Sequence, residues 1–202
     1  MECFFSIGEV VFDIRKATQV AAYLLWKRGG EMSCLKLMKL MYLAEKQFLL
    51  DHGEQLTGDK MVSMPMGLVL SAVYDCFTGG EEPYWNSWMT KPSHHDLALN
   101  TDIMVNQDDP LDTFDELFLA DQNILDKVFS EYGKMNRREL VERLQNPINC
   151  PEWEDPQGSS YPIPIPPSSL LIKNGKTKEE ADAVLQKLAE EDDLLTVTQG
   201  LA

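Results

Sequence analysis

The sequence lacks the features that would assign it to several common classes of protein. Among its 202 residues there are only four cysteines, none of them in a C-x-x-C pair, so the usual zinc and redox motifs are missing. No apolar run approaches the roughly 18 residues that a membrane span requires. The amino terminus has no basic segment with a cleavage site, so we expect no signal peptide and a cytoplasmic protein with reduced thiols.

Recognisable catalytic motifs are missing as well. The sequence contains no G-x-S-x-G, P-loop, H-E-x-x-H or dinucleotide fingerprint, and it has only three histidines. His94 and His95 adjoin Asp96, but neighbouring side chains diverge on a strand, which argues against a metal site there. We therefore predict a protein that is not an enzyme, with no catalytic residues, no cofactor and no metal site.

Positive charge is scarce in this chain, whose formal net charge is −15. Between Asp96 and Asp126 there are nine carboxylates and no lysine or arginine. Nucleic-acid-binding surfaces need concentrated basic side chains, so we do not expect a nucleic-acid partner. Two interpretations of the acidic stretch stay open: a solvated loop with a helix start, or a docking surface for a cationic protein.

Apolar residues, by contrast, are abundant at 44% of the chain, and they are densest in residues 34–48. This segment is rich in strong helix formers, and Ser33 is a candidate N-cap. At about 100° per residue, apolar side chains cover most of the helix circumference, while Lys36, Lys39 and Lys46 share one narrow face. The pattern predicts a helix inside the protein with one solvated basic ridge.

Glu45 falls in the middle of the apolar arc of this helix. A buried carboxylate must be paired, hydrogen-bonded or protonated. Three interpretations stay open: a structural network, a general acid or base, and a specificity contact with a partner. The candidate partners in a structural network are Arg15, Arg28 and Tyr74.

Local signals predict a mainly α fold (α+β), with a compact helical domain around the buried helix and a small β-sheet or hairpin. The sequence Met64-Pro65-Met66-Gly67 is expected to open a second helix, after a short edge strand that Pro65 ends. Residues 84–105 are expected to form either short strands or a packed loop. The further expected helices run from Asp13 to about Arg28, from about Leu68 to Phe77, from Asp121 to about Tyr132, and from an Asn136–Glu139 capping box to about Gln145.

The carboxyl-terminal part has a different composition, with seven of the eleven prolines between Pro147 and Pro167. Residues 161–167 must be extended. They could be a linker or a ligand for an aromatic groove, but their isoleucines favour a strap on the chain's own domain. A final helix should start at Thr177 and fray at the acidic run 190–193. We predict a domain over residues 1–155 and a strap with a helix over 156–202.

Two segments carry a resemblance to a known family. Lys36-Leu37-Met38-Lys39-Leu40-Met41-Tyr42-Leu43-Ala44, followed by Gly67-Leu68-Val69-Leu70-Ser71-Ala72-Val73-Tyr74, resembles the SocA-like antitoxin domain, also called the Panacea domain. The family pattern is K-L-x-K-L-x-Y-x-A, then G-P-V-x-x-x-x-Y. A second match covers Leu125 to Trp153 and includes Pro151-Glu152-Trp153. The chain departs from the pattern at Leu68, where the family usually has proline, and it has no histidine between Leu144 and Trp153.

The resemblance implies an antitoxin, common in phage and mobile-element genomes, that binds and occludes a co-encoded protein toxin. The acidic charge indicates a toxin with a basic surface, while self-association stays open. Some members of the family present the toxin to a protease, so a proteolytic adaptor or scaffold is the alternative, and a small-molecule enzyme centred on Glu45 is a further one. The residues expected at or beneath the partner-binding surface are Lys36, Lys39, Tyr42, Glu45, Lys46, Gly67, Tyr74 and Trp153.

Overall fold

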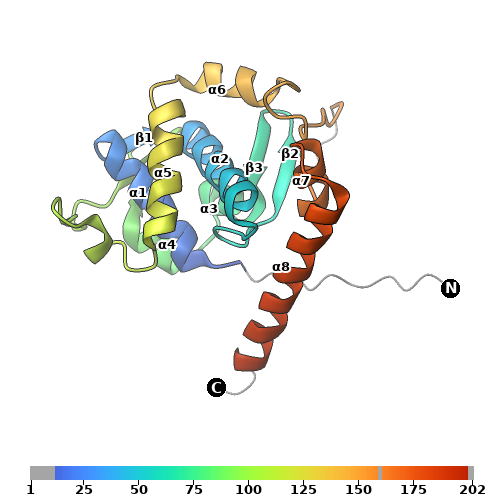
Figure 1. Ribbon diagram of the computed structural model, residues 1–202. Helices are drawn as coiled ribbons and strands as arrows, with labels where there is room; N and C mark the ends of the chain where they lie inside the picture. The colour runs from blue at the N-terminus through green and yellow to red at the C-terminus, as the bar shows by residue number, and fades with distance from the viewer. Residues whose placement is uncertain (1–11, 159–160, 200–202) are drawn as a thin grey trace.

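A computed structural model describes residues 12–158 and 161–199. This part of the chain forms eight α-helices and two three-stranded sheets. Helix α2 (Cys34–His52) lies at the centre, and the other elements surround it (Figure 1). The predicted mainly α fold with small β-sheets and a buried central helix is confirmed.

Helix α1 (Ile14–Arg28) packs beside α2 and begins where the sequence predicts. The Asp13 carboxylate accepts hydrogen bonds from the amides of Arg15 and Lys16 at 2.9 and 3.0 Å, as an N-cap does. Gly29 ends the helix with a φ of 100°, which glycine adopts without strain. Ser33 occupies the N-cap position of α2, but its side chain makes no capping hydrogen bond.

The first sheet has the antiparallel order β1-β5-β4 and covers one end of α1 and α2. Its strands are β1 (Glu31–Ser33), β4 (Met89–Thr90) and β5 (Asp96–Leu99). Helix α4 (Pro83–Trp88) precedes β4. Residues 84–105, for which the sequence left strands or a packed loop open, thus contain both helix and sheet.

The second sheet corrects two predictions. Met64-Pro65-Met66-Gly67 does not open a helix, because β2 (Met61–Met64) pairs with β3 (Gly67–Leu70) as a hairpin joined by Pro65 and Met66. Helix α3 (Ser71–Thr78) follows only after β3. Strand β2 is also not an edge strand, since β6 (Ile163–Pro164) pairs with its other side.

Two further helices cover the lysine-bearing face of α2. Helix α5 (Leu119–Tyr132) begins two residues before the predicted cap, because Asp121 lies one turn inside it and accepts a hydrogen bond from the Phe118 amide at 2.8 Å. Helix α6 (Arg137–Leu144) has the predicted capping box of Asn136 and Glu139. A 3-10 turn, η1 (Pro110–Asp112), lies before α5.

The carboxyl-terminal segment packs on the rest of the molecule, as the strap interpretation predicts. The Ile165 amide donates to the Met61 carbonyl at 2.9 Å, next to the β6–β2 pairing. Helix α7 (Pro167–Lys173) buries Leu170 and Leu171. Helix α8 (Lys178–Gln199) runs along this side, and its far end extends away from the body (Figure 1). It continues as a helix through the acidic run, where the sequence predicts fraying, to Gln199. No described helix is long and apolar enough to cross a membrane.

Candidate partner-binding site

The three lysines of α2 do not form a solvated ridge, and that prediction is wrong. The exposed fraction is 6% for Lys36, 0% for Lys39 and 8% for Lys46. Helices α5 and α6, strand β3 and residues 145–153 cover this face, and each ammonium group bonds to one of those covering segments. The acceptors are the Gly133 carbonyl for Lys36 at 2.6 Å, the Leu68 carbonyl for Lys39 at 2.8 Å, and the Glu152 carboxylate for Lys46 at 2.7 Å.

Lys39 and Gly67 lie in close contact. Burial lowers the pKa of Lys39 to about 7, so the amine carries a charge only part of the time near neutral pH. A Cβ atom added at Gly67 would lie 3.3 Å from the Lys39 Nζ, and Gly67 has a φ of +92°. Glycine is therefore required at the hairpin by both backbone conformation and the lysine beneath it.

Glu152 is the centre of a buried polar network that the sequence did not predict. Its carboxylate accepts hydrogen bonds from the Tyr42 hydroxyl at 2.9 Å and the Asn174 amide at 3.0 Å, in addition to Lys46. Only 1% of Glu152 is exposed. The network joins α2, the segment after α6, and the end of α7. Glu152 lies within the Pro151-Glu152-Trp153 motif, which is the only sign of this network in the sequence.

Glu45 has a structural network, with partners other than those expected. Its two carboxylate oxygens accept from the Leu56 amide at 2.8 Å and from the Thr57 amide and hydroxyl at 2.9 and 2.7 Å. Arg15 instead pairs with Glu116. Burial raises the pKa of Glu45 to about 7, against the opposing effect of the Thr57 and Leu56 hydrogen bonds. The carboxylate holds the loop after α2 and is 0% exposed, which leaves it no access to a solvent-borne substrate.

The predicted partner-binding residues thus lie in the interior or at its margin. Tyr74 and Trp153 are half-buried and pack against the core. The Trp153 indole N–H is one of three buried side-chain polar atoms without a hydrogen-bond partner within the described residues. The structure brings Tyr42 and Lys46 together on Glu152, and Lys39 together with Gly67. Glu45 and Tyr74 belong to other contacts.

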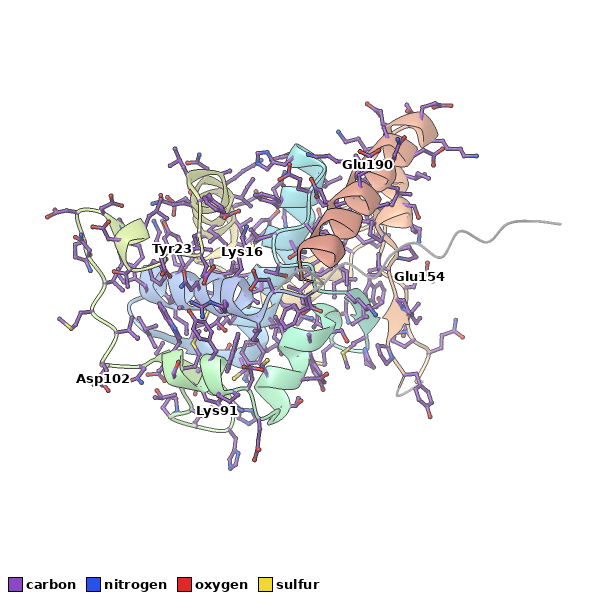
Figure 2. All side chains as sticks on the ribbon, turned by 90° about the horizontal axis from the view of Figure 1, so that it is seen from below. Lys16, Tyr23, Lys91, Asp102, Glu154 and Glu190 are labelled. Carbon is purple, nitrogen blue, oxygen red and sulfur yellow. The ribbon has the colours of Figure 1, made fainter. Side chains whose placement is uncertain are left out.

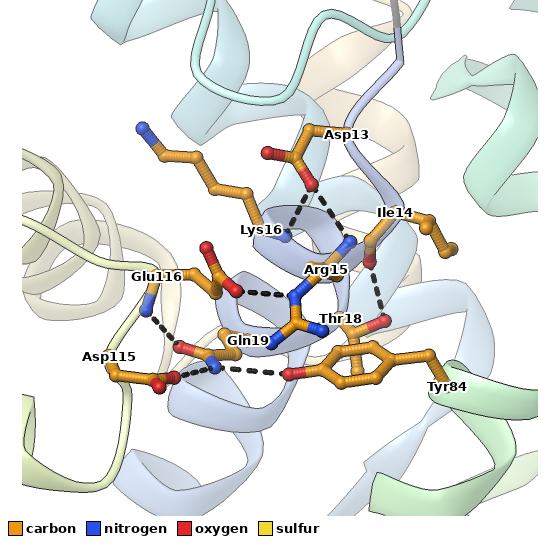
Figure 3. A network of polar contacts seen from close by, with 9 residues as sticks. All are labelled: Asp13, Ile14, Arg15, Lys16, Thr18, Gln19, Tyr84, Asp115 and Glu116. Carbon is orange, nitrogen blue, oxygen red and sulfur yellow. Dashed lines mark hydrogen bonds and ion pairs between the residues drawn. The ribbon is translucent and has the colours of Figure 1, made fainter. Parts of the chain in front are cut away.

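Part of the acidic stretch is used inside the molecule. The buried Gln19 side chain donates to Asp115 at 2.6 Å and to the Tyr84 hydroxyl at 3.2 Å, and accepts from the Glu116 amide at 2.8 Å (Figure 3). Arg15 pairs with Glu116 in the same network. Two more ion pairs, Lys16–Asp121 at 3.1 Å and Lys27–Asp126 at 3.0 Å, hold α1 to α5.

Asp96 lies in β5, and the other carboxylates lie on residues 100–113, which we name the acidic loop. It projects to one side of the body, with Asp102 at its start, while Glu190 lies on α8 at the opposite side (Figures 1 and 2). Asn106 orders the loop by accepting from the amides of Asp108 and Asp109 at 3.0 and 3.3 Å. Exposed apolar side chains lie on this loop and just after it: Met104 at 83%, Phe118 at 71% and Leu119 at 64%.

Of three comparisons with known proteins, one found a match. The family model described as "Antitoxin SocA-like, Panacea domain" matches residues 37–153. That range includes most of α2, the β2–β3 hairpin, α5, α6 and Glu152, and it covers more than half of the chain. No curated protein and no solved structure matches the chain. The chain belongs to the family of antitoxins with a SocA-like, Panacea domain.

Proposed function

We propose that this protein is an antitoxin that binds a co-encoded protein toxin and holds it inactive in the cytoplasm, without catalysing a reaction. The match of the family model over residues 37–153 carries the proposal. The burial of Glu45, whose oxygens are occupied by the loop after α2, supports a binding role over an enzymatic one.

The surface of the molecule supports a protein partner of opposite charge. The acidic loop carries Asp102, Asp108, Asp109 and Asp112, all exposed, near three exposed apolar side chains. With a net charge of −15, the chain attracts a basic protein over a distance. Exposed apolar groups then supply contact area that charge alone does not. Lys36, Lys39, Tyr42, Glu45 and Lys46 lie in the interior, where they hold the segments around α2 in place.

Co-expression with the product of the adjacent gene tests the proposal. We expect that gene product to arrest growth alone, and the wild-type chain to restore growth and to co-elute with it in size-exclusion chromatography. A Leu40→Lys variant, which places a charge at a fully buried position, should fail to restore growth. Toxicity that the wild-type chain leaves unchanged would contradict the proposal. The abundance of the neutralised protein separates occlusion, in which it is maintained, from delivery to a protease, in which it falls.

A further inference from the structure

A pocket of about 330 Å³ opens between α2, α5 and α6. Lys46 of α2, Lys127 of α5 and Arg143 of α6 line it, together with one carboxylate, Glu131. Its volume lies at the lower end of the range that proteins use to enclose small groups. Ile148, in the turn after α6, stands at the rim and is 88% exposed.

The charge of this pocket is opposite to that of the molecule. Three cations face it against one carboxylate, although the chain as a whole carries a net charge of −15. Each cation also has a carboxylate partner, and two of these partners, Asp51 and Glu152, do not line the pocket. Two of the three cations in the lining are therefore balanced by carboxylates that lie outside it.

The ion pairs of Lys127 with Asp51 and of Arg143 with Glu131 each occupy one N–H donor, so both cations have donors to spare. Lys46 directs its ammonium group at Glu152, the Asn149 carbonyl and the Cys150 sulfur. Arg143 meets Glu131 through one terminal nitrogen at 3.2 Å, and 37% of its side chain is exposed. A guanidinium group has five N–H donors in a planar fork that suits a carboxylate. Its guanidinium carbon lies 5.2 Å from the centre of the Tyr132 ring, within the range of a cation–π contact.

We propose that this pocket receives a carboxylate side chain of the toxin, next to an apolar side chain that packs on Ile148. The inference rests on the proposed function and specifies where the bound protein is recognised. Net charge brings a basic partner to the acidic surface, and the isolated basic pocket then selects the one acidic group that fixes the orientation of the complex. Specificity arises because a partner without that carboxylate leaves the Arg143 fork unpaired in the interface.

Two arginines of α6 make a matched test. Arg143 and Arg138 each pair with one glutamate, but Arg138 pairs with Glu142 one turn away and does not line the pocket. Binding of the purified adjacent-gene product is measured by isothermal titration calorimetry. We expect Arg143→Glu to weaken binding about tenfold or more and Arg138→Glu to change it less than about twofold. Arg143→Lys, which keeps the charge but not the fork, should fall between them.

A double-mutant cycle identifies the proposed carboxylate. Each aspartate and glutamate of the bound protein is replaced by alanine and combined with Arg143→Ala, and one of them should be energetically coupled to it. Thermal unfolding of the free variants verifies that they are folded.

If the wild-type chain binds and Arg143→Glu binds equally well, this inference fails and the proposed function stands. If the wild-type chain does not bind at all, both fail. Citrate is a probe for binding of a small free carboxylate. The inference would also be overturned if citrate stabilises the wild type against unfolding and no carboxylate of the bound protein couples to Arg143.

Discussion

At the scale of single residues, the motif lysines of α2 are structural donors. Each one buries an aliphatic stem along the core and ends on an oxygen of a segment far away in sequence. A helical wheel predicts which side chains share a face, and it placed Lys36, Lys39 and Lys46 together correctly. It contains no information on what covers that face, since the covering segments lie 29 to 106 residues further along the chain.

The buried Lys39 should give the protein a distinctive dependence of stability on pH. Its pKa falls from 10.5 in the unfolded chain to about 7 in the folded protein. The unfolded state therefore binds more protons between these values, and the free energy of unfolding rises with pH across that window. The Lys39 contribution is largest above pH 10.5 and is progressively lost as the pH falls to 7.

Replacing Lys39 with methionine should abolish this rise. Between pH 7 and pH 9 we expect the unfolding free energy of the wild type to increase by about 2 kcal/mol relative to Lys39→Met, as urea titrations at both pH values would measure. Lys134→Met removes an exposed lysine and should keep the wild-type profile. Parallel profiles for the wild type and Lys39→Met would show that the amine is not desolvated as described.

At the scale of elements, the helices were predictable where their own termini carry the signal. Asp13 with Gly29, and Asn136 with Glu139, are local capping signals, and the helices begin or end beside them. Residues 67–70 were not predictable in this way, because four apolar residues fit a strand or the first turn of a helix. Residues 67–70 form a strand because they pair with Met61–Met64, and this pairing is a contact that the local sequence pattern does not show.

The Glu152 network should be the most sensitive polar contact between elements. Glu152→Ala leaves the Lys46 ammonium group, the Tyr42 hydroxyl and the Asn174 amide without their shared acceptor. Losing one partner of a buried ion pair costs about 3–5 kcal/mol. Denaturant unfolding measures this cost.

Glu154→Ala supplies the comparison for Glu152→Ala. It breaks the pair with Lys173, in which the side chains are 57% and 35% exposed. Such a pair contributes less than about 1 kcal/mol. Equal losses of unfolding free energy in the two variants would remove the distinction between the network and the surface pair.

Strand β6 and helix α7 should protect the rest of the chain from self-association. A chain ending at Asp155 loses the pairing of β6 with Val62 and Ser63 and uncovers the surface beneath Leu170 and Leu171. An exposed strand edge is a template for pairing with another chain. We expect this truncation to form dimers or larger species in light scattering after size exclusion. A chain ending at Glu191 keeps both elements and should elute as the full-length chain does. A stable monomer ending at Asp155 would instead support an autonomous domain over residues 1–155.

At the scale of the whole molecule, the net charge can be read directly from the sequence. The structure is needed to show where the charged side chains lie. The stretch 96–126 divides into carboxylates that hold α1, carboxylates exposed on the acidic loop, and Asp96 in strand β5. Composition determines the number of carboxylates but not which of them are paired. The sequence does not distinguish an aspartate that is paired through a tertiary contact from one that is exposed to solvent.

The acidic loop should control how fast the partner associates. A variant with Asp102, Asp108 and Asp109 changed to asparagine removes three exposed charges but keeps side chains that can accept the loop's hydrogen bonds. We expect its association rate constant with the adjacent-gene product, measured by stopped flow at low salt, to fall about tenfold. The difference from wild type should shrink at about 0.5 M salt, where charges are screened.

A control for the acidic loop lies on α8, which carries exposed carboxylates on the other side of the molecule (Figure 2). The control variant also removes three negative charges, through the changes Glu179→Gln, Asp182→Asn and Glu190→Gln. Its association rate should stay closer to wild type if the acidic loop, and not α8, steers the approaching partner. Equal effects of the two variants would assign the rate to net charge alone.

The bond between Asn174 and Glu152 also sets an order of events during synthesis. Residues 37–153 emerge from the ribosome before strand β6 and helix α7 do. In that interval the Glu152 carboxylate lacks one of its three donors, and strand β2 lacks one of its two neighbours. Folding of the family domain is therefore completed only after residues 163–174 have also emerged. A ribosome that stops early releases a chain that cannot reach the finished fold.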